Sequence, residues 1–225
     1  MTDAAAELPA AAAQVFGAGL PLAQRYAGRL ATDGVERGLL GPRETGRLWD
    51  RHLLNSAVLT DLVPVGARVV DVGTGAGLPG VVMAIRRPDL RVDLVEPMQR
   101  RVEFLIETVD ELGLGDRIRV VRGRADDAET VRRVGGADWV VARAVAPLDR
   151  LVRWCLPLLS ARGRLLALKG AGVAAEAQQH AVALRRSGAQ VASIEQLGDG
   201  VLMQCTWVAV VTRRPAKAKG LRGVT

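Results

Sequence analysis

A dense glycine cluster follows an apolar run in the stretch VVDVGTGAGLPG, residues 69–80. Four of its glycines fall within the eight positions 73–80. Glycine loses more conformational freedom on folding than any other residue, so such a cluster indicates a turn in which the backbone adopts positive φ or approaches another group closely. The preceding ARVVDV, residues 67–72, is typical of a buried strand. The pattern therefore predicts a strand, a tight turn and a following helix.

Apolar runs and helical segments alternate through the rest of the chain. Strands are predicted over residues 67–72, 90–95, 117–121, 138–142 and 163–168, and helices over residues 16–30, 44–62, 79–87, 98–112 and 148–159. Near the end, VASIEQL, the turn GDG and VLMQCTWVAVVTR predict an antiparallel hairpin. This order is typical of an α/β fold with a mostly parallel, doubly wound sheet, here of seven strands, that ends in an antiparallel hairpin.

The composition suits one domain with a small helical extension, since 49% of the 225 residues are hydrophobic. We expect an N-terminal tail and helical extension over residues 1–62, of which residues 1–13 fray, and a main domain over residues 63–212. Residues 213–225 hold five basic residues and no acidic one, against a net charge of +7 for the chain. This basic tail fits a segment lying along a phosphate backbone and a solubilising end equally well.

Targeting and metal signals are not evident in the sequence. No apolar run approaches the roughly 18–20 residues that cross a bilayer, and the first 30 residues lack a secretory signal pattern. Cys155 and Cys205 lie in apolar surroundings without metal-ligand spacing. We therefore expect a cytoplasmic protein with reduced core cysteines, no metal and no membrane contact, and we expect it to be a monomer.

The glycine-rich turn fits three kinds of ligand site, which the flanking residues separate. A phosphate-binding P-loop ends in Lys and then Ser or Thr, whereas this turn ends in Leu-Pro-Gly. Glu96, about 20 residues further on, suits the ribose of either a nicotinamide cofactor or S-adenosylmethionine. Asp71 before the glycines, Asp126 after the third strand and the closing hairpin favour S-adenosylmethionine. The residues thus predict a methyltransferase.

Several segments together resemble the RsmG (GidB) family of 16S ribosomal RNA guanine-N7 methyltransferases. They are VVDVGTGAGLPG, RHLLNS, EPMQRRVEFL, VVARAVAPL and LLALKG, and the resemblance extends over residues 37–212. It implies a Rossmann-like class I methyltransferase fold, S-adenosylmethionine as cofactor, and 16S rRNA or the small ribosomal subunit as partner. The cofactor-binding residues that we expect from the pattern and the resemblance are Asp71, Gly73, Gly75, Gly77, Leu78, Glu96, Ala125, Asp126 and Arg143.

Two positions depart from the family pattern. Glu96 stands where many relatives carry Asp, although its longer side chain should still reach the ribose hydroxyls. An NLT motif of many relatives aligns with Gly38, Leu39 and Leu40, so its active-site Asn is missing here. This loss leaves open a binding-only assembly factor, and a small-molecule methyltransferase is the other alternative.

Methylation at guanine N7 agrees with the residues at the end of the fourth strand. N7 carries a lone pair and no proton at neutral pH, so the reaction needs positioning and charge tolerance rather than a general base. Arg143 follows this strand where other base methyltransferases carry a nucleophilic Cys or an Asn/Asp-Pro-Pro stretch. We expect Arg143 and Lys169 to be catalytic, with two cations on one sheet edge that bind phosphate or the O6 edge of guanine. His52, Arg100 and Arg101 are interpreted as structural or solvent-facing residues near the cofactor.

Overall fold

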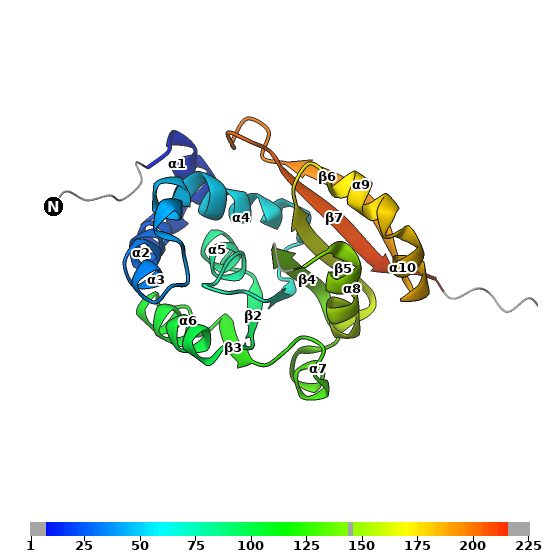
Figure 1. Ribbon diagram of the computed structural model, residues 1–225. Helices are drawn as coiled ribbons and strands as arrows, with labels where there is room; N and C mark the ends of the chain where they lie inside the picture. Colours follow the sequence, from blue (N-terminus) through cyan, green and yellow to red (C-terminus); the bar gives the residue numbers. More distant parts are fainter. Residues whose placement is uncertain (1–7, 144–145, 216–225) are drawn as a thin grey trace, which may run out of the picture.

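The computed structural model describes residues 8–143 and 146–215, which form a seven-stranded sheet between two layers of helices (Figure 1). Its strands are β1 (Arg68–Val72), β2 (Arg91–Glu96), β3 (Ile118–Arg122), β4 (Ala137–Arg143), β5 (Leu159–Lys169), β6 (Ala189–Leu197) and β7 (Thr206–Arg213). The strand order is β3-β2-β1-β4-β5-β7-β6. The pairs among β1 to β5 are parallel, whereas β7 is antiparallel to β5 and β6. The predicted doubly wound sheet with a terminal hairpin is confirmed.

Successive side chains of each strand enter two separate cores, because side chains alternate between the faces of a sheet. Val69 of β1 and Val208 of β7 pack in one core, and their neighbours Val70 and Ala209 pack in the other. The helices on the first face are α1 (Ala10–Phe16), α2 (Leu20–Ala31), α3 (Asp33–Glu36), α4 (Asn55–Ala57), α5 (Gly80–Arg86) and α6 (Gln99–Glu111). Those on the second are α7 (Ala128–Val134), α8 (Leu148–Cys155), α9 (Val173–Gln179) and α10 (Ala181–Arg186). Burial on both faces explains why the parallel strands are almost continuously apolar.

The segment before β1 differs from the continuous helix that we predicted over residues 44–62. It divides into the 3-10 helix η2 (Pro42–Arg47), the π-helical η3 (Leu48–Leu54), α4 and the 3-10 helix η4 (Val58–Leu62). In η3 the side chains of Leu48, Trp49, His52, Leu53 and Leu54 are all buried, which is a wider face than one α-helical stripe provides. π-Helical turns are rare in proteins, and those that occur are often found at functional sites.

The prediction that residues 1–13 fray is wrong for residues 10–13. Helix α1 begins at Ala10, inside the stretch expected to fray, because Ala12 and Phe16 are buried in the first core. The ring of Phe16 packs edge-on against Trp49, with 6.1 Å between ring centroids. In addition, the Tyr26 hydroxyl of α2 donates a hydrogen bond of 2.7 Å to the carbonyl of Ala76 in the glycine-rich turn. The N-terminal helices therefore share a core with the sheet, and the boundary at residue 62 stays a prediction.

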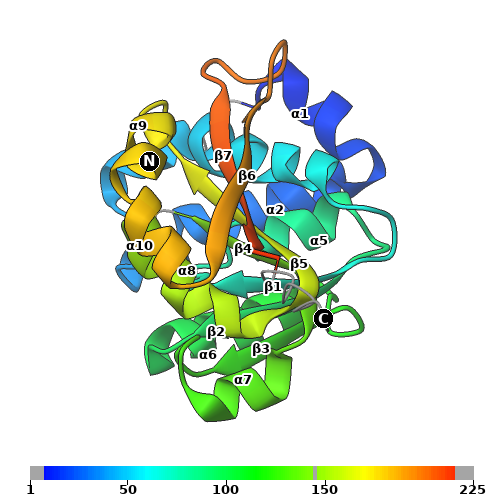
Figure 2. The same cartoon turned by 90° about the vertical axis from the view of Figure 1, so that its right-hand side faces the viewer.

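Three boundaries in the C-terminal half also differ. The predicted helix over 148–159 ends at Cys155, since Pro157 disfavours further α-helix, and β5 already begins at Leu159. The hairpin has a long connection over residues 198–205, which projects beyond the sheet on the side of α1 (Figures 1 and 2). The helices α7, α9 and α10 were not predicted.

The expected basic tail starts later than residue 213. Arg213 is the last residue of β7, and its Nη2 donates to the carbonyls of Leu156 at 2.6 Å and Leu159 at 3.1 Å. Residues 216–225 lie outside the described part. No helix of the described residues is long and apolar enough to cross a membrane.

Candidate functional site

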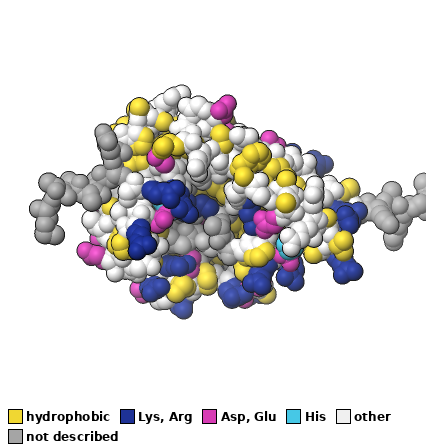
Figure 3. Space-filling model, turned by 45° about the horizontal axis from the view of Figure 1, so that its top comes forward, with side chains coloured by type: hydrophobic (Ala, Val, Ile, Leu, Met, Phe, Trp, Pro, Cys, Tyr) yellow, Lys and Arg dark blue, Asp and Glu magenta, His cyan; other side chains and the backbone are white. Residues whose placement is uncertain are grey.

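A cavity of about 1150 Å³ opens at the carboxyl ends of β1, β4 and β5. Its walls come from the glycine-rich turn, the ends of β4 and β5, the segment η2–η3 and the β6–β7 connection. The described lining residues are Leu39, Leu40, Arg47, Asp50, Arg51, His52, Asn55, Gly73, Thr74, Gly75, Ala76, Leu78, Arg101, Arg143, Leu168, Lys169, Gly170, Met203, Gln204, Cys205 and Thr206. Figure 3 shows Lys and Arg side chains beside the hollow on this face.

The glycines of the turn serve different purposes. Gly73 and Gly75 have φ of 65° and 62° and line the cavity. A Cβ at Gly75 would meet nothing closer than the Gly73 carbonyl at 4.0 Å, so the space in front of this residue is open to a ligand. A Cβ at Gly77 would lie 2.7 Å from the Tyr26 hydroxyl and 2.6 Å from Val81 Cγ2. Gly77 is therefore required by packing, and it does not line the cavity.

Asp71 lies beneath the turn and holds it in shape. Its Oδ2 accepts hydrogen bonds from the Thr74 hydroxyl at 2.6 Å and the Gly80 backbone N–H at 2.8 Å. Its Oδ1 is buried without a hydrogen-bond partner among the described residues. Burial raises the pKa of Asp71 to about 6, although the two hydrogen bonds oppose this shift. The structure gives this carboxyl a scaffolding position behind the cavity wall.

Glu96 ends β2 directly behind the turn and is 1% exposed. Its Oε2 accepts the Gly75 N–H at 3.0 Å, and its Oε1 accepts the Met98 N–H at 3.1 Å. Both oxygens thus already bind backbone, and Glu96 is not among the lining residues. Its reach to a ribose stays a prediction.

Ala125 and Asp126, expected beside the adenine, also lie outside the cavity wall. Ala125 is buried in the second core. The carboxylate of Asp126 is exposed and pairs with Arg124, with 3.1 Å between Nε and Oδ1. A role for either residue in cofactor binding stays a prediction.

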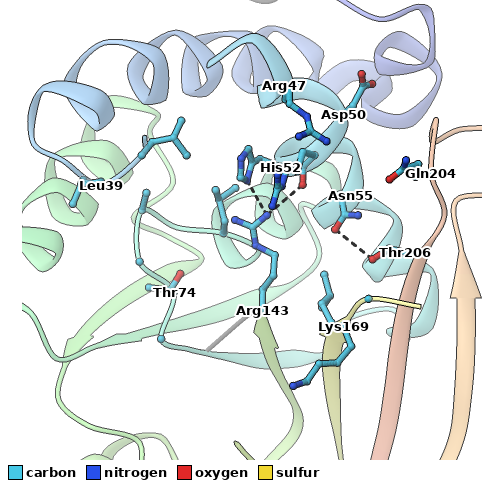
Figure 4. Close-up of a pocket in the computed structure, with 18 of the residues that line it drawn as sticks. Leu39, Arg47, Asp50, His52, Asn55, Thr74, Arg143, Lys169, Gln204 and Thr206 are labelled. Atoms are coloured by element: carbon cyan, nitrogen blue, oxygen red, sulfur yellow. Dashed lines mark hydrogen bonds between the residues drawn. The ribbon is translucent and has the colours of Figure 1, made fainter. Parts of the chain in front are cut away.

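Arg143 projects from the end of β4 into the cavity, toward η3 (Figure 4). Its Nη1 donates to His52 Nδ1 at 3.0 Å and to the Arg51 carbonyl at 3.4 Å. Among the described residues, no other group accepts a hydrogen bond from its guanidinium and no carboxylate pairs with it. Burial lowers the pKa of Arg143 from its ordinary value, although the side chain stays cationic at neutral pH. The site therefore holds a positive charge with N–H groups available to an anion or a carbonyl oxygen.

The ammonium of Lys169, which we expected to bind phosphate, instead contacts other groups of the protein. Its stem lines the cavity, but its ammonium is directed away from Arg143 (Figure 4). Nζ donates to the Ala146 carbonyl at 2.8 Å and to Glu176 Oε1 at 2.9 Å. The same Glu176 oxygen accepts the Leu148 N–H at 2.8 Å. Lys169 thus joins β5, α9 and the chain that follows β4.

Other basic residues divide between the cavity and the surface. Arg47, Arg51 and Arg101 line the cavity, whereas Arg100 is exposed and does not. Arg101 Nη1 lies 3.6 Å from Glu96 Oε1, and its Nε is buried without a hydrogen-bond partner in the described part of the chain. The interpretation as a solvated helix face therefore fits Arg100 and does not fit Arg101.

Sequence reasoning missed several residues that the fold brings to the cavity. Cys205 lies in the β6–β7 connection and lines the cavity instead of packing in the core, whereas Cys155 is buried as expected. Asn55 and Thr206 meet across the cavity, with 3.4 Å between Oδ1 and Oγ1. Leu39 and Leu40 present apolar side chains where the family motif has Leu and Thr after its Asn. Leu39, Leu40 and Asn55 lie in segments that the family resemblance includes, whereas no local signal marks Cys205 or Thr206, since their neighbours in the cavity are distant in sequence. The described residues contain no group of three or more His, Cys, Asp or Glu that could hold a metal ion.

The sequence is similar to those of known proteins along most of its length. A family model, GidB, described as rRNA small subunit methyltransferase G, matches residues 20–204. The "Ribosomal RNA small subunit methyltransferase G" of Salinispora arenicola is 55% identical, over 96% of this chain and 94% of its own. The protein of the same name from Mycobacterium marinum is 51% identical, over 94% of this chain and 92% of its own.

Solved structures show the same fold at low sequence identity. A putative S-adenosylmethionine-dependent methyltransferase from Methanococcus maripaludis has a TM-score of 0.57 at 14% identity, over 86% of this chain and 95% of its own. An O-methyltransferase from neocarzinostatin biosynthesis, solved with S-adenosylmethionine and a naphthoic acid, has a TM-score of 0.58 at 17% identity, over 91% and 74%. The Rossmann-like methyltransferase fold expected from the sequence is thus confirmed.

Proposed function

This chain belongs to the GidB family of rRNA small subunit methyltransferase G proteins, and from that premise we propose that it transfers a methyl group from S-adenosylmethionine to N7 of a guanine in 16S ribosomal RNA. Its partner is 16S rRNA or the small ribosomal subunit that contains it, and it acts in the cytoplasm as a monomer. Arg47, Arg51, Arg101 and Arg143 make the cavity basic, as contact with a phosphate backbone requires.

The cavity fits the cofactor at the glycine-rich turn. Gly73, Gly75 and Leu78 would hold it, since the space in front of Gly75 is open and Gly75 adopts a backbone conformation that favours glycine. Glu96 supports this turn from behind through the Gly75 N–H. When bound, S-adenosylmethionine supplies an electrophilic methyl group on a sulfonium. The volume of about 1150 Å³ exceeds that of most small-molecule pockets, roughly 300–1000 Å³, and so leaves room for a nucleotide beside the cofactor.

The residue at the end of β4 supports guanine N7 as the atom that is methylated. It presents Arg143 to the cavity, where a cytosine-C5 enzyme needs a thiolate and an adenine-amine enzyme needs an Asn or Asp motif. Because N7 has no proton, the residues need only place the base, shield it from water and tolerate the cationic product. The free N–H groups of Arg143 suit the O6 oxygen of guanine or an adjacent phosphate. Cys205 also lines the cavity, but it belongs to the β6–β7 connection and not to the end of β4.

The test is methyl transfer from labelled S-adenosylmethionine to ribosomal substrates from cells that lack this protein. Naked 16S rRNA and whole small subunits are assayed side by side, and the labelled nucleosides are identified. We expect 7-methylguanosine as the labelled product. Labelled 5-methylcytidine would contradict the N7 assignment and implicate Cys205. Tight cofactor binding without a labelled nucleoside would favour a small-molecule substrate or a binding-only role.

A further inference from the structure

Three side chains that are distant in sequence form a hydrogen-bonded line at the wall of the cavity. Glu44 of η2 contacts His52 of η3, with 2.8 Å between Oε2 and Nε2. The other ring nitrogen of His52, Nδ1, lies 3.0 Å from Nη1 of Arg143 at the end of β4. Figure 4 shows the imidazole of His52 and the guanidinium of Arg143 directed toward each other. His52 is 8% exposed, so its ring is held in one place by packing.

The chemistry of the three groups determines where the protons lie. A guanidinium only donates hydrogen bonds, so Nδ1 of His52 must accept from Arg143 and carries no proton. The remaining ring proton is then on Nε2 and is donated to the carboxylate of Glu44. The second bond of a histidine selects its tautomer in this way. A protonated His52 would place an N–H of like charge against Arg143.

The electrostatics of the ring agree with a neutral His52. Its pKa is lowered because burial, foremost, and the cation of Arg143 disfavour the imidazolium. The charged groups that face the ring are Glu44 from η2, Arg51 from η3 and Arg143 from β4, and of these only Glu44 raises the pKa. The pKa of Glu44 is lowered, chiefly by its hydrogen bond to His52, so Glu44 is the ionised acceptor.

The hydrogen bond to His52 is the main contact that fixes the orientation of the Arg143 guanidinium. Besides His52, the described residues offer Arg143 only the carbonyl of Arg51, at 3.4 Å. That carbonyl belongs to the same π-helical segment as His52, so in the described part of the chain η3 provides both hydrogen-bond acceptors that orient the guanidinium of Arg143.

We propose that Glu44 and His52 are positioning residues for methyl transfer: Glu44 selects the His52 tautomer with a bare Nδ1, and this nitrogen orients the guanidinium of Arg143 toward the target guanine. The proposal rests on the proposed function for its kinetic consequence. Its structural content, the tautomer and the contact, is independent of any substrate.

Because the contact with Arg143 requires an unprotonated Nδ1 on His52, we expect kcat/KM for methyl transfer to decrease when His52 is protonated. Above the pKa of His52 the ring accepts from Arg143, and transfer proceeds. As the pH falls through that pKa, Nδ1 gains a proton, the contact is lost and kcat/KM declines. Replacing Glu44 with Gln keeps an acceptor for Nε2–H but removes the charge that raises the pKa of His52. The acid limb of the Glu44→Gln profile should therefore lie at lower pH than that of the wild type.

The decisive experiment combines ¹⁵N NMR of the imidazole rings with kinetics of the full chain. The sequence has two histidines, so His180→Asn assigns the spectrum and serves as the matched control, since His180 lies at the junction of α9 and α10. We expect the wild type to show a bare Nδ1 and a protonated Nε2 at His52. The NMR titration of His52 should agree with the acid limb of kcat/KM, which reports groups of the free enzyme.

Two substitutions at His52 separate positioning from folding. The side-chain oxygen of His52→Asn takes the place of Nδ1, so this variant should keep transfer within about threefold and lose the acid limb. His52→Ala should lower kcat by about 10- to 100-fold, toward the level of Arg143→Ala, with a smaller change in KM for RNA. His180→Asn should keep both the rate and the acid limb.

Two results would overturn the proposal. One is a protonated Nδ1 at His52 in the folded wild type. The other is transfer by His52→Ala at the wild-type rate. A wild type that labels no rRNA contradicts the proposed function instead, and the NMR result still decides the tautomer.

Discussion

At the scale of single residues, the charged groups predicted to contact ligands largely bind the protein itself. Glu96 and Lys169 direct their polar atoms to backbone or to a partner side chain, and Asp71 does so with its Oδ2. They shape the turn and the chain around β4, and they leave Arg143 as the basic residue at the end of β4 that faces the cavity. Burial of such groups has thermodynamic consequences that can be measured.

The raised pKa of Asp71 predicts a pH dependence of stability. Between its unfolded value of 3.8 and the folded value of about 6, the folded protein keeps a proton that the unfolded chain has lost. Rising pH therefore destabilises the fold through this group, by about 3 kcal/mol over that range. An Asp71→Asn variant lacks the titration, so the stability advantage of the wild type over it should shrink by about 2 kcal/mol between pH 4 and pH 7, since part of the change already occurs below pH 4.

Urea unfolding of the wild type and Asp71→Asn at both pH values measures this difference. All other groups titrate alike in the two proteins and cancel. A stability difference that stays constant with pH would show that Asp71 titrates normally.

At the scale of elements, the turn between β1 and α5 combines two functions in one short segment. Gly75 faces open space in the cavity, whereas Gly77 faces the Tyr26 hydroxyl and Val81. The cluster thus serves both ligand access and the packing of α2 against the turn. Substitutions at the two glycines should separate these functions.

Gly75→Ala should keep the fold and weaken the binding of S-adenosylmethionine. Its φ of 62° costs an alanine about 1–2 kcal/mol, without a steric clash. Gly77→Ala adds a clash to a φ of 106° and should lower stability by about 3 kcal/mol or more. Thermal unfolding and titration calorimetry measure the two effects. A Gly77→Ala protein as stable as the wild type would contradict this division.

At the scale of the whole molecule, the N-terminal helices and the sheet form one structural unit. Tyr26 and Leu30 of α2 are fully buried in the same core as the strands β1 and β2. Helix α2 also supports the cavity wall through the bond from Tyr26 to Ala76. Removing these helices would expose to water the part of one sheet face that α5 and α6 do not cover.

We therefore predict that residues 63–225 alone do not unfold cooperatively and do not bind S-adenosylmethionine. A chain of residues 8–225, which keeps all the described helices, is the matched control and should retain both properties. Circular dichroism during thermal unfolding and calorimetry test the pair. A shorter fragment that folds and binds the cofactor would show that residues 1–62 are a separate unit.

The sequence by itself determined the features that depend on neighbours along the chain. Strand, turn and helix around the glycine cluster follow from apolar periodicity and from turn chemistry, which act over a few residues. The alternation of these units then limits the topology to a doubly wound sheet, and the motifs indicate the family. The broken segment 42–62 escaped prediction because burial on several sides, rather than local propensity, sets its winding.

Only the tertiary structure decided which polar groups meet. His52 and Arg143 are 91 positions apart, and Asn55 and Thr206 are 151 apart. No periodicity reaches across such distances, and the direction of a long side chain such as Lys169 depends on the acceptors that the fold places within a few ångströms. The location of the site was thus readable from the chain, whereas the partners of its charges were set by packing.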